Sequence, residues 1–294
     1  MTTTTTNDHL LRVLTLTLVR HGESTDNIIP IWAGHRDATL TNFGHSQAQR
    51  LGDSLKDQDF DRIFCSDLKR AHLTANQIRI QNLKNPVITP SSDQNSKDEE
   101  SNDQGTAKKK SDLVVLPLIR EQNFGEAEGE RWDTGRCTYE GFYSNKALKF
   151  KDGESRDDVY ERAAKFHKEV IIPEWSSILS NDQPTKHKAV HFCIVSHGIF
   201  LSELIAYLKA FVEPSGGSSN PEHFSNTGWE RINLTWNWSA DHHQPLELVS
   251  LKKLHSNVTQ HLTGLKRQPG GIGNAPWDPN QSKLDAFFSV SPKK

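Results

Sequence analysis

The sequence predicts an α/β protein, a three-layer sandwich in which helices cover both faces of a mostly parallel central sheet. Short apolar segments alternate along the chain with amphipathic helical patterns, and polar turns separate them. Residues 190–195 form a continuous apolar run, as expected for a central strand that is buried on both faces. With 294 residues and no internal repeat, the chain can bury the core of one large domain, which we place at residues 10–266.

The composition argues against several classes of protein. Apolar residues make up 34% of the chain, and 37 acidic residues balance 35 basic ones, so the whole surface has no strong attraction for nucleic acid or an anionic membrane. The cysteines Cys65, Cys137 and Cys193 are far apart, which argues against a disulfide framework or a zinc site. The sequence has no secretory signal pattern and no apolar run of about 18 residues. We therefore expect a soluble protein of the cytoplasm or nucleus that contacts neither nucleic acid directly nor a membrane.

The first half of the predicted domain consists of strand–turn–helix units that follow a disordered lead-in at residues 1–9. A strand at residues 13–18 is followed by an irregular stretch at 27–40 and by a helix that begins near Thr41. Residues 62–66 form the next predicted strand, and a second helix follows it. The apolar positions of the two helices recur at intervals of three and four residues: Ala48, Leu51 and Leu55 in the first, and Leu68, Ala71, Ala75 and Ile78 in the second.

Two polar segments interrupt this pattern. Residues 91–111 contain almost no apolar side chain, and we predict a disordered insertion because such a segment cannot bury enough surface to offset its ordering entropy. A short strand is predicted at residues 113–116. Residues 122–155 are polar and aromatic with several glycines, which suits a lid or a substrate-facing excursion.

The second half returns to regular elements and ends in a segment of different composition. The predicted elements are a helix around residues 159–170, the strand at 190–195, a helix at 199–211, and two strands at 231–238 and 246–251. From residue 267 to residue 294, glycine, proline and polar side chains predict a flexible tail.

Two histidines stand at the carboxyl ends of predicted strands, where open α/β sheets place their active sites. His21 and His197 are each followed by a glycine, which lets a ligand approach the imidazole closely. Arg20 precedes the first histidine, and Arg70 lies in the first turn of the second predicted helix. Guanidinium groups suit the oxygens of a phosphate, and a neutral imidazole can attack phosphorus. Glu121 is the carboxylate best placed for acid–base catalysis.

Each of these residues also has a less specific interpretation. A single histidine at a strand end is more often structural, an arginine on a helix is usually a surface charge, and Glu121 could be a solvated loop carboxylate. Glu126 and Glu128 are rival candidates for the acid–base role. The joint occurrence of these residue types at strand ends is what favours a phosphate-transfer site.

A series of short motifs runs in order through residues 12–262. They are Arg20-His21-Gly22-Glu23-Ser24 with Asn27, Leu40-Thr41 with Gly44, Ser66-Asp67-Leu68-Lys69-Arg70-Ala71 with Thr74-Ala75, Arg120-Glu121 with Gly125 and Glu128-Gly129, Gly153-Glu154-Ser155, Ser196-His197-Gly198, and Asn226-Thr227-Gly228. This series resembles the motifs of the histidine phosphatases, also called the phosphoglycerate mutase-like superfamily. The resemblance implies a covalent phosphohistidine on His21, with Arg20, Arg70 and His197 holding the phosphoryl group and Glu121 donating a proton.

The same resemblance implies further features of the site. Asn27 and Glu23 would be neighbours in the phosphate pocket, and neither a metal ion nor a cofactor would be needed. In the acid phosphatase and phytase branch an aspartate follows the second histidine. Gly198 stands there in this chain, which implies the branch that uses Glu121. The remaining histidine groups, His242-His243 and His255 with His261, lack the carboxylate support expected of metal ligands.

Two reactions remain open, namely hydrolysis of a phosphate monoester and phosphoglycerate mutase-type phosphoryl transfer. The family's mutases follow their catalytic glutamate with a Tyr-Gly stretch, a lysine and a double arginine, whereas residues 122–129 contain none of these and only Arg131 lies nearby. The acidic lid would repel a second phosphate, so hydrolysis of a small phosphorylated substrate is favoured. Trp32 and Trp132 are candidates for the leaving-group pocket, with core packing as the alternative.

The tail contains a second motif, formed by Gln281, Leu284, Phe287 and Phe288. Its spacing resembles the box that binds the DNA sliding clamp, because one helical turn would gather the three apolar side chains into a plug beside the glutamine. The alternatives are that this motif at residues 281–288 docks on the chain's own domain or matches by chance. A clamp-binding adaptor with a secondary or silent phosphatase site is therefore an alternative class of function, although the intact set of site residues favours a working enzyme.

Overall fold

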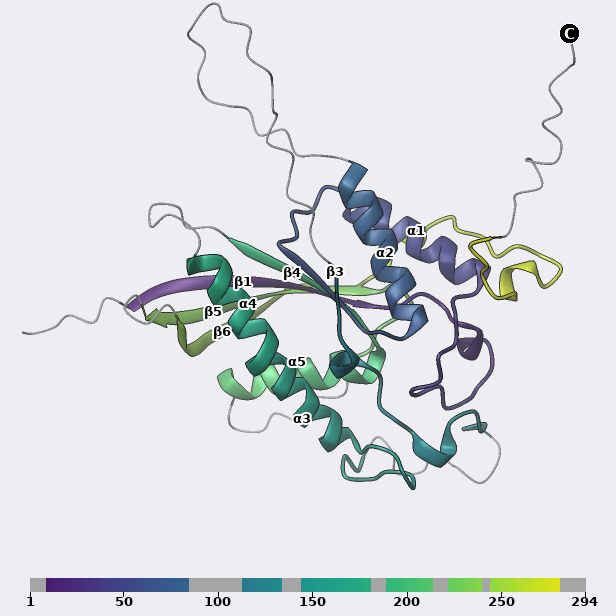
Figure 1. Ribbon diagram of the computed structural model, residues 1–294, viewed down its shortest axis with the longest axis horizontal. Coiled ribbons are helices and arrows are strands. Elements are labelled where there is room, and N and C mark those ends of the chain that lie inside the picture. The colour runs from purple at the N-terminus through teal and green to yellow at the C-terminus, as the bar shows by residue number, and fades with distance from the viewer. Residues whose placement is uncertain are drawn as a thin grey trace, which may run out of the picture.

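A six-stranded sheet with helices on both faces organises the part of the chain that the computed structural model describes, residues 9–84, 113–133, 144–180, 189–213, 222–239 and 244–280 (Figure 1). The strands lie in the order β3-β2-β4-β1-β5-β6. Their bounds are β1 His9–Arg20, β2 Arg62–Cys65, β3 Leu113–Val115, β4 Val190–Ser196, β5 Trp229–Ser239 and β6 Gln244–Val258. The predicted insertion at 91–111 and the tail motif at 281–288 lie outside the described residues, as does nearly all of the predicted lead-in.

The sheet is mostly parallel, and this brings the two histidine-bearing loops together. β1, β2, β3 and β4 run in the same direction, whereas β5 pairs antiparallel with β1 and β6 pairs antiparallel with β5. The register of β1 and β4 pairs Arg20 with Ser196. Because neighbouring parallel strands end at the same edge of a sheet, the next residues, His21 and His197, emerge side by side. The predicted fold class is confirmed.

Helices cover the two faces of the sheet in separate groups (Figure 1). Their bounds are α1 Asn42–Leu55, α2 Lys69–Lys84, α3 Arg156–Phe166, α4 Ile172–Ser180 and α5 Gly198–Val212. On one face, Leu51 of α1 and Ile78 of α2 pack in a cluster with Val19 and Ile63 of the sheet. Helices α3, α4 and α5 cover the other face. None of the helices in the described ranges is long and apolar enough to cross a membrane.

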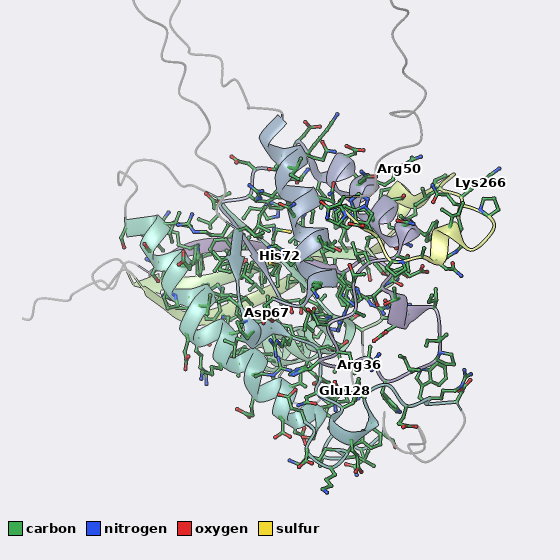
Figure 2. All side chains as sticks on the ribbon, turned by 45° about the vertical axis from the view of Figure 1, so that its right-hand side comes forward. Arg36, Arg50, Asp67, His72, Glu128 and Lys266 are labelled. Carbon is green, nitrogen blue, oxygen red and sulfur yellow. The ribbon has the colours of Figure 1, made fainter. Side chains whose placement is uncertain are left out.

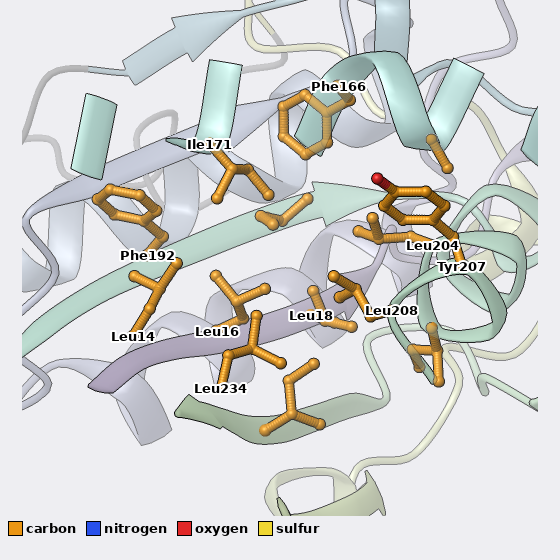
Figure 3. Packing of buried hydrophobic residues seen from close by; sticks show 14 of the residues in the cluster. Leu14, Leu16, Leu18, Phe166, Ile171, Phe192, Leu204, Tyr207, Leu208 and Leu234 are labelled. Carbon is orange, nitrogen blue, oxygen red and sulfur yellow. The ribbon is translucent and has the colours of Figure 1, made fainter. Parts of the chain in front are cut away.

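The larger core lies between the sheet and α3, α4 and α5 (Figure 3). Leu14, Leu16 and Leu18 alternate along β1, so all three face this side, and each is fully buried. They belong to one cluster with Phe192 of β4 and Phe166 of α3. Burial of each such side chain stabilises the folded state by about 1.5–3 kcal/mol, so this packing anchors the strand that ends at His21.

Side-chain caps define the starts of two helices. Thr41 Oγ1 accepts the backbone N–H of Gly44 at 2.9 Å, so α1 begins where the sequence predicts. Ser155 and Asp158 form a reciprocal capping box at the start of α3. The helix predicted around residues 159–170 continues from α3 through a π-helical turn at His167–Ile171 into α4.

Residues 267–280, here called the C-terminal strap, pack against the start of α1. The Trp277 ring stacks on His45 with 4.1 Å between ring centroids, and its backbone N–H donates to the Leu40 carbonyl at 2.8 Å. The Arg267 guanidinium lies 4.3 Å from the centroid of the Phe43 ring. The packed chain therefore extends beyond the predicted domain boundary at residue 266, because a tryptophan and an arginine give this polar segment two stacking contacts.

Two histidines, one buried and one partly buried, make the stability of the fold depend on pH. His167 lies in the larger core with its ring stacked 5.6 Å from that of Trp236, and burial lowers its pKa from 6.5 to about 4. Burial likewise lowers the pKa of His191 to about 4. The unfolded chain therefore binds protons near pH 6.5 that the folded chain excludes, and the free energy of unfolding falls as the pH drops from 6.5 towards 4.

Replacing His167 should flatten this pH dependence. A lowering of the pKa to about 4 corresponds to about 3 kcal/mol lost between pH 6.5 and 4, and His167→Phe removes that contribution while keeping an aromatic ring. Urea unfolding at a series of pH values measures the slope. The control is His72→Gln, because His72 is exposed on α2 (Figure 2). A His167→Phe slope equal to that of the wild type would contradict the prediction.

Candidate active site

His21 is held in one protonation state by its neighbours. Its Nδ1 lies 2.7 Å from the carbonyl oxygen of Gly22, and because a carbonyl can only accept, Nδ1 is the nitrogen that carries the proton. Nε2 then holds a lone pair, and Arg70 Nε donates to it at 3.3 Å. Burial, Arg70 and Arg20 lower the pKa of His21 well below 6.5, so the imidazole is neutral at pH 7. This is the form in which an imidazole acts as a nucleophile.

His197 stands beside His21 at the N-cap position of α5, directly after β4. The two ring centroids are 5.0 Å apart, and His197 is fully buried. Burial, followed by the charge of Arg70, lowers its pKa well below 6.5. Neither ring nitrogen has a hydrogen-bond partner within the described part of the chain. Since a buried polar atom without a partner is costly, the nitrogen that carries the proton of this neutral ring is available to donate to an oxygen of a ligand.

Arg70, near the start of α2, is a buried cation with only 1% of its surface exposed. Its Nη2 donates to the Gly34 carbonyl at 2.8 Å and its Nη1 to the Arg36 carbonyl at 2.7 Å. Burial lowers its pKa to about 10, and within the described residues it forms no salt bridge. A buried guanidinium without a carboxylate in contact marks a favourable position for an anion.

Arg20 is the last residue of β1 and adds a second guanidinium. Its Nη1 donates to the Phe224 carbonyl at 2.7 Å, which fixes the side chain. Its charge acts on both imidazoles, because it contributes to the lowered pKa of His21 and of His197. The structure therefore brings two arginines and two histidines together at the carboxyl edge of the sheet.

Glu121 follows the 3-10 turn Pro117–Ile119 that succeeds β3. Its carboxylate accepts the backbone N–H groups of Ile199 at 3.1 Å and Phe200 at 3.2 Å, in the first turn of α5. The N-terminus of a helix is a favourable position for a carboxylate, and this one begins directly after His197. The charge of Glu121 also acts on Arg70. Glu121 therefore lies beside the same group of side chains.

The rival carboxylates are placed elsewhere. Glu126 is exposed on the lid. Glu128 Oε1 accepts the backbone N–H of His35 at 2.7 Å and of Phe124 at 3.2 Å, so it joins the lid to the loop that carries Gly34. Figure 2 shows Arg36 of this loop near Glu128, and the Glu128 charge raises the pKa of Arg36 after the larger effect of Asp26.

Asn27 lies beside the histidine loop. Its Oδ1 accepts the N–H and the hydroxyl of Ser24, both at 3.0 Å, and the amide of Asn226 at 3.3 Å. Asn226 also donates to the backbone carbonyl of His21 at 3.2 Å. Because the amide oxygen of Asn27 already accepts these hydrogen bonds, its NH2 group is the end that can donate to a ligand.

The Glu23 carboxylate is engaged by two other side chains. Its two carboxylate oxygens accept from the two Nη atoms of Arg267 at 2.8 and 2.6 Å, and Thr41 Oγ1 donates to it at 2.9 Å. The resemblance implied a neighbour of the phosphate at this position. In the structure the carboxylate ties the C-terminal strap to the histidine loop.

The lid is described at both ends, residues 122–133 and 144–155. Trp32 and Phe124 are buried together in a small cluster against Phe150, with 4.6 Å between the first two ring centroids. Trp32 is 3% exposed and so packs in this cluster, whereas Trp132 is 42% exposed. Three residues next in sequence to site residues, Asp26, Lys69 and Arg120, form ion pairs: Asp26 with Arg36 at 2.8 Å, Arg120 with Asp67 at 2.5 Å, and Lys69 with Asp37 at 3.2 Å.

Sequence reasoning missed two parts of the site. The carbonyls of Gly34 and Arg36 orient Arg70, and the only local signal was a glycine in an irregular stretch; its φ of +48° is a left-handed conformation that glycine adopts readily. Arg162 contacts the backbone that carries Glu121, and nothing in its neighbourhood of the sequence distinguishes it from a surface arginine. Within the described ranges, no three histidine, cysteine, aspartate or glutamate side chains are grouped to hold a metal ion.

Comparison with known proteins decides the family. The model of the histidine phosphatase superfamily (branch 1) matches residues 16–91 and 104–244. The chain belongs to the histidine phosphatase superfamily. It is a phosphatase, an enzyme of the hydrolase class.

Relatives extend over most of the chain. The fructose-2,6-bisphosphatase TIGAR B of Danio rerio is 29% identical over 245 residues, which are 75% of this chain and 86% of that protein. A protein of Schizosaccharomyces pombe named as a probable phosphatase is 25% identical over 94% of this chain and 80% of its own length. A 2,3-bisphosphoglycerate-dependent phosphoglycerate mutase of Bartonella henselae is 26% identical over 66% of this chain and 81% of its own.

A solved structure shares the fold of this superfamily member. The mycobacterial glucosyl-3-phosphoglycerate phosphatase superposes with a TM-score of 0.59 over 84% of this chain and 100% of that one, at 18% sequence identity. At this identity the likeness concerns the fold alone.

Glu23→Gln should weaken the strap and leave phosphate binding almost unchanged. The substitution keeps the shape of the side chain but removes the charge that pairs with Arg267, so the free energy of unfolding should fall by about 1 kcal/mol. The dissociation constant of vanadate, a phosphate analogue, should change less than about threefold, whereas Arg70→Gln should raise it at least about tenfold. Calorimetry measures vanadate binding and urea unfolding measures stability. A tenfold loss of vanadate affinity in Glu23→Gln would place Glu23 in the phosphate site after all.

Proposed function

We propose that the enzyme hydrolyses a phosphate monoester without a metal ion, through a phosphohistidine formed on Nε2 of His21. The observation that carries this proposal is the form of the imidazole. Its proton is held on Nδ1 by the Gly22 carbonyl, and its Nε2 lone pair lies beside the Arg70 guanidinium. A nucleophile with a directed lone pair next to a group that binds phosphate oxygens is what phosphoryl transfer requires.

In the first step, Nε2 of His21 attacks phosphorus and the bond between phosphorus and the ester oxygen breaks. The leaving oxygen takes a proton from Glu121 and departs as an alcohol. Arg20 and Arg70 stabilise the charge on the transferred phosphoryl oxygens, and His197 and the NH2 group of Asn27 supply further hydrogen bonds. In the second step, water attacks phosphorus, its proton returns to Glu121, and inorganic phosphate leaves with the P–N bond broken. Both steps then balance with water as the co-substrate.

Hydrolysis is favoured over mutase-type transfer by the charges around the pocket. A mutase must hold a substrate that carries a second anionic group, which needs cations beyond those that bind the transferred phosphate. Lys69 and Arg120, the cations next in sequence to Arg70 and Glu121, are paired with carboxylates, as is Arg36, and the lid adds Glu126 and Glu130, which are exposed. We therefore propose a small phosphate monoester as substrate. Gly198 supports the assignment of Glu121 as proton donor, because it leaves the space beside that carboxylate open.

Activity should depend on His21. Wild type and His21→Ala are compared on sugar phosphates, nucleotides, phosphoglycerates and phosphopeptides by the release of inorganic phosphate. We expect at least one good substrate, with a loss of at least about 1,000-fold in His21→Ala because no other group replaces the nucleophile. His72→Ala, on the exposed face of α2, is the matched control. Denaturing quench with a labelled substrate should leave an acid-labile phosphate on the peptide that contains His21. Full activity in a folded His21→Ala variant would refute the mechanism.

We propose, as a second and separate function, that the tail binds a DNA sliding clamp. The spacing of Gln281, Leu284, Phe287 and Phe288 supports this proposal, and these residues lie outside the described part of the chain. The pattern offers an apolar plug and a polar side chain to a preformed groove. This proposal implies that the protein is located in the nucleus, or in both nucleus and cytoplasm.

A labelled peptide of residues 279–294 and the full chain should both bind purified clamp in fluorescence anisotropy and pull-down assays. Replacing Phe287 and Phe288 together by alanine should weaken binding at least about tenfold, because the apolar plug supplies most of the contact. Phosphatase activity should not change. Absence of binding by the intact peptide and the full chain would exclude the adaptor function.

A further inference from the structure

The guanidinium of Arg162, in α3, uses all five of its N–H groups. Nε and Nη2 donate to the two carboxylate oxygens of Glu154 at 2.8 and 2.9 Å. Nη1 donates to the carbonyls of Leu118 and Arg120, each at 2.9 Å, and Nη2 also donates to the carbonyl of Glu121 at 3.0 Å. The side chain is only 17% exposed. A surface ion pair makes far fewer hydrogen bonds than these five.

These contacts fix the backbone of the proton donor. The Glu121 carbonyl accepts from Arg162 and from Nε2 of His35, the latter at 2.9 Å. The carboxylate of the same residue is held by the N–H groups of Ile199 and Phe200. The Arg162 guanidinium also lies 5.5 Å from the Phe200 ring centroid. Glu121 is therefore held at its side-chain end by α5 and at its backbone end by α3.

The same guanidinium also contacts the base of the lid, where the two ends of the lid meet. Glu154 Oε2, one of its partners, also accepts the backbone N–H of Asn123 at 2.9 Å. The backbone N–H of Glu154 donates to the Asn123 carbonyl at 2.7 Å, and the Gln122 side chain donates to the Glu154 carbonyl at 2.6 Å. Residues near both ends of the lid thus meet beside Arg162.

We propose that Arg162 is a positioning residue that holds Glu121 where it can give its proton to the leaving oxygen. This role rests on the function proposed above. Lysine cannot replace it, because an ammonium group has three donors on a flexible stem and cannot span three carbonyls and a carboxylate in fixed directions. Loss of the guanidinium should therefore impair proton transfer in particular, beyond any loss of stability.

The test separates proton transfer from phosphate binding by the choice of leaving group. An alkyl phosphate needs a proton on its departing oxygen, whereas 2,4-dinitrophenyl phosphate releases a stable anion without one. We measure kcat/KM for the best alkyl substrate of the wild type and for the aryl ester, and take the ratio of the two. This ratio does not depend on the folded fraction of a variant, because the same molecules hydrolyse both substrates.

The ratio of alkyl to aryl kcat/KM should fall about 10- to 100-fold in Arg162→Lys and in Arg162→Gln, and about 100-fold or more in Glu121→Gln. The matched control is Arg62→Lys. Arg62 donates through Nε to Glu174 at 3.0 Å at the start of β2, away from the pocket, and its replacement should leave the ratio unchanged.

A wild-type ratio in both Arg162 variants would overturn the positioning role, even if their overall activity or stability were lower. The phosphohistidine mechanism is judged separately by His21→Ala. That variant should lose activity on both esters whatever the Arg162 variants do, and a folded His21→Ala enzyme that still hydrolyses both would refute the mechanism itself.

Discussion

Two guanidinium groups and two imidazoles share one buried space at the carboxyl edge of the sheet, and only neutral imidazoles are compatible with this arrangement. Burial opposes a charge on either ring, and Arg70 and Arg20 oppose it again by repulsion, so the pKa of both His21 and His197 is lowered. The positive potential that keeps His21 neutral is also what draws a phosphate into the pocket. In the proposed mechanism, the reactive form of the nucleophile and the affinity for its substrate therefore have one physical cause.

A buried cation without a carboxylate in contact needs other support, and the loop before α1 provides it. Arg70 donates to the carbonyls of Gly34 and Arg36, whose dipoles partly replace the lost water. Gly34 makes this possible because it adopts a left-handed conformation at a point where a Cβ would meet the Glu128 side chain. Glu128 in turn accepts the N–H of His35. Residues that never touch the substrate thus determine where the phosphate-binding guanidinium points.

The features that could be predicted from the sequence are those that residues close by in the sequence indicate. His21 and His197 follow apolar strands and precede glycines, so both their positions and the parallel sheet were predictable. The ion pair of Glu23 was not, because its partner, Arg267, is 244 residues later in a segment whose composition predicts a flexible tail. Arg162 was missed for a related reason: its function depends on which carbonyls the fold places opposite one turn of α3, and no pattern of neighbouring residues records that.

In the proposed mechanism, the base of the lid separates the residues that perform the chemistry from those we expect around the leaving group. Two hydrogen bonds join Asn123 and Glu154 there: the Glu154 N–H donates to the Asn123 carbonyl, and the Asn123 N–H donates to the Glu154 carboxylate, which also accepts from Arg162. Residues between them can change the space around the leaving group without moving Glu121, because the backbone of Glu121 is held on the other side of this junction. Under the proposed function, changes in a lid joined in this way can alter which ester fits. The distance from the proton donor to the reacting oxygen stays fixed, as proton transfer in the transition state requires.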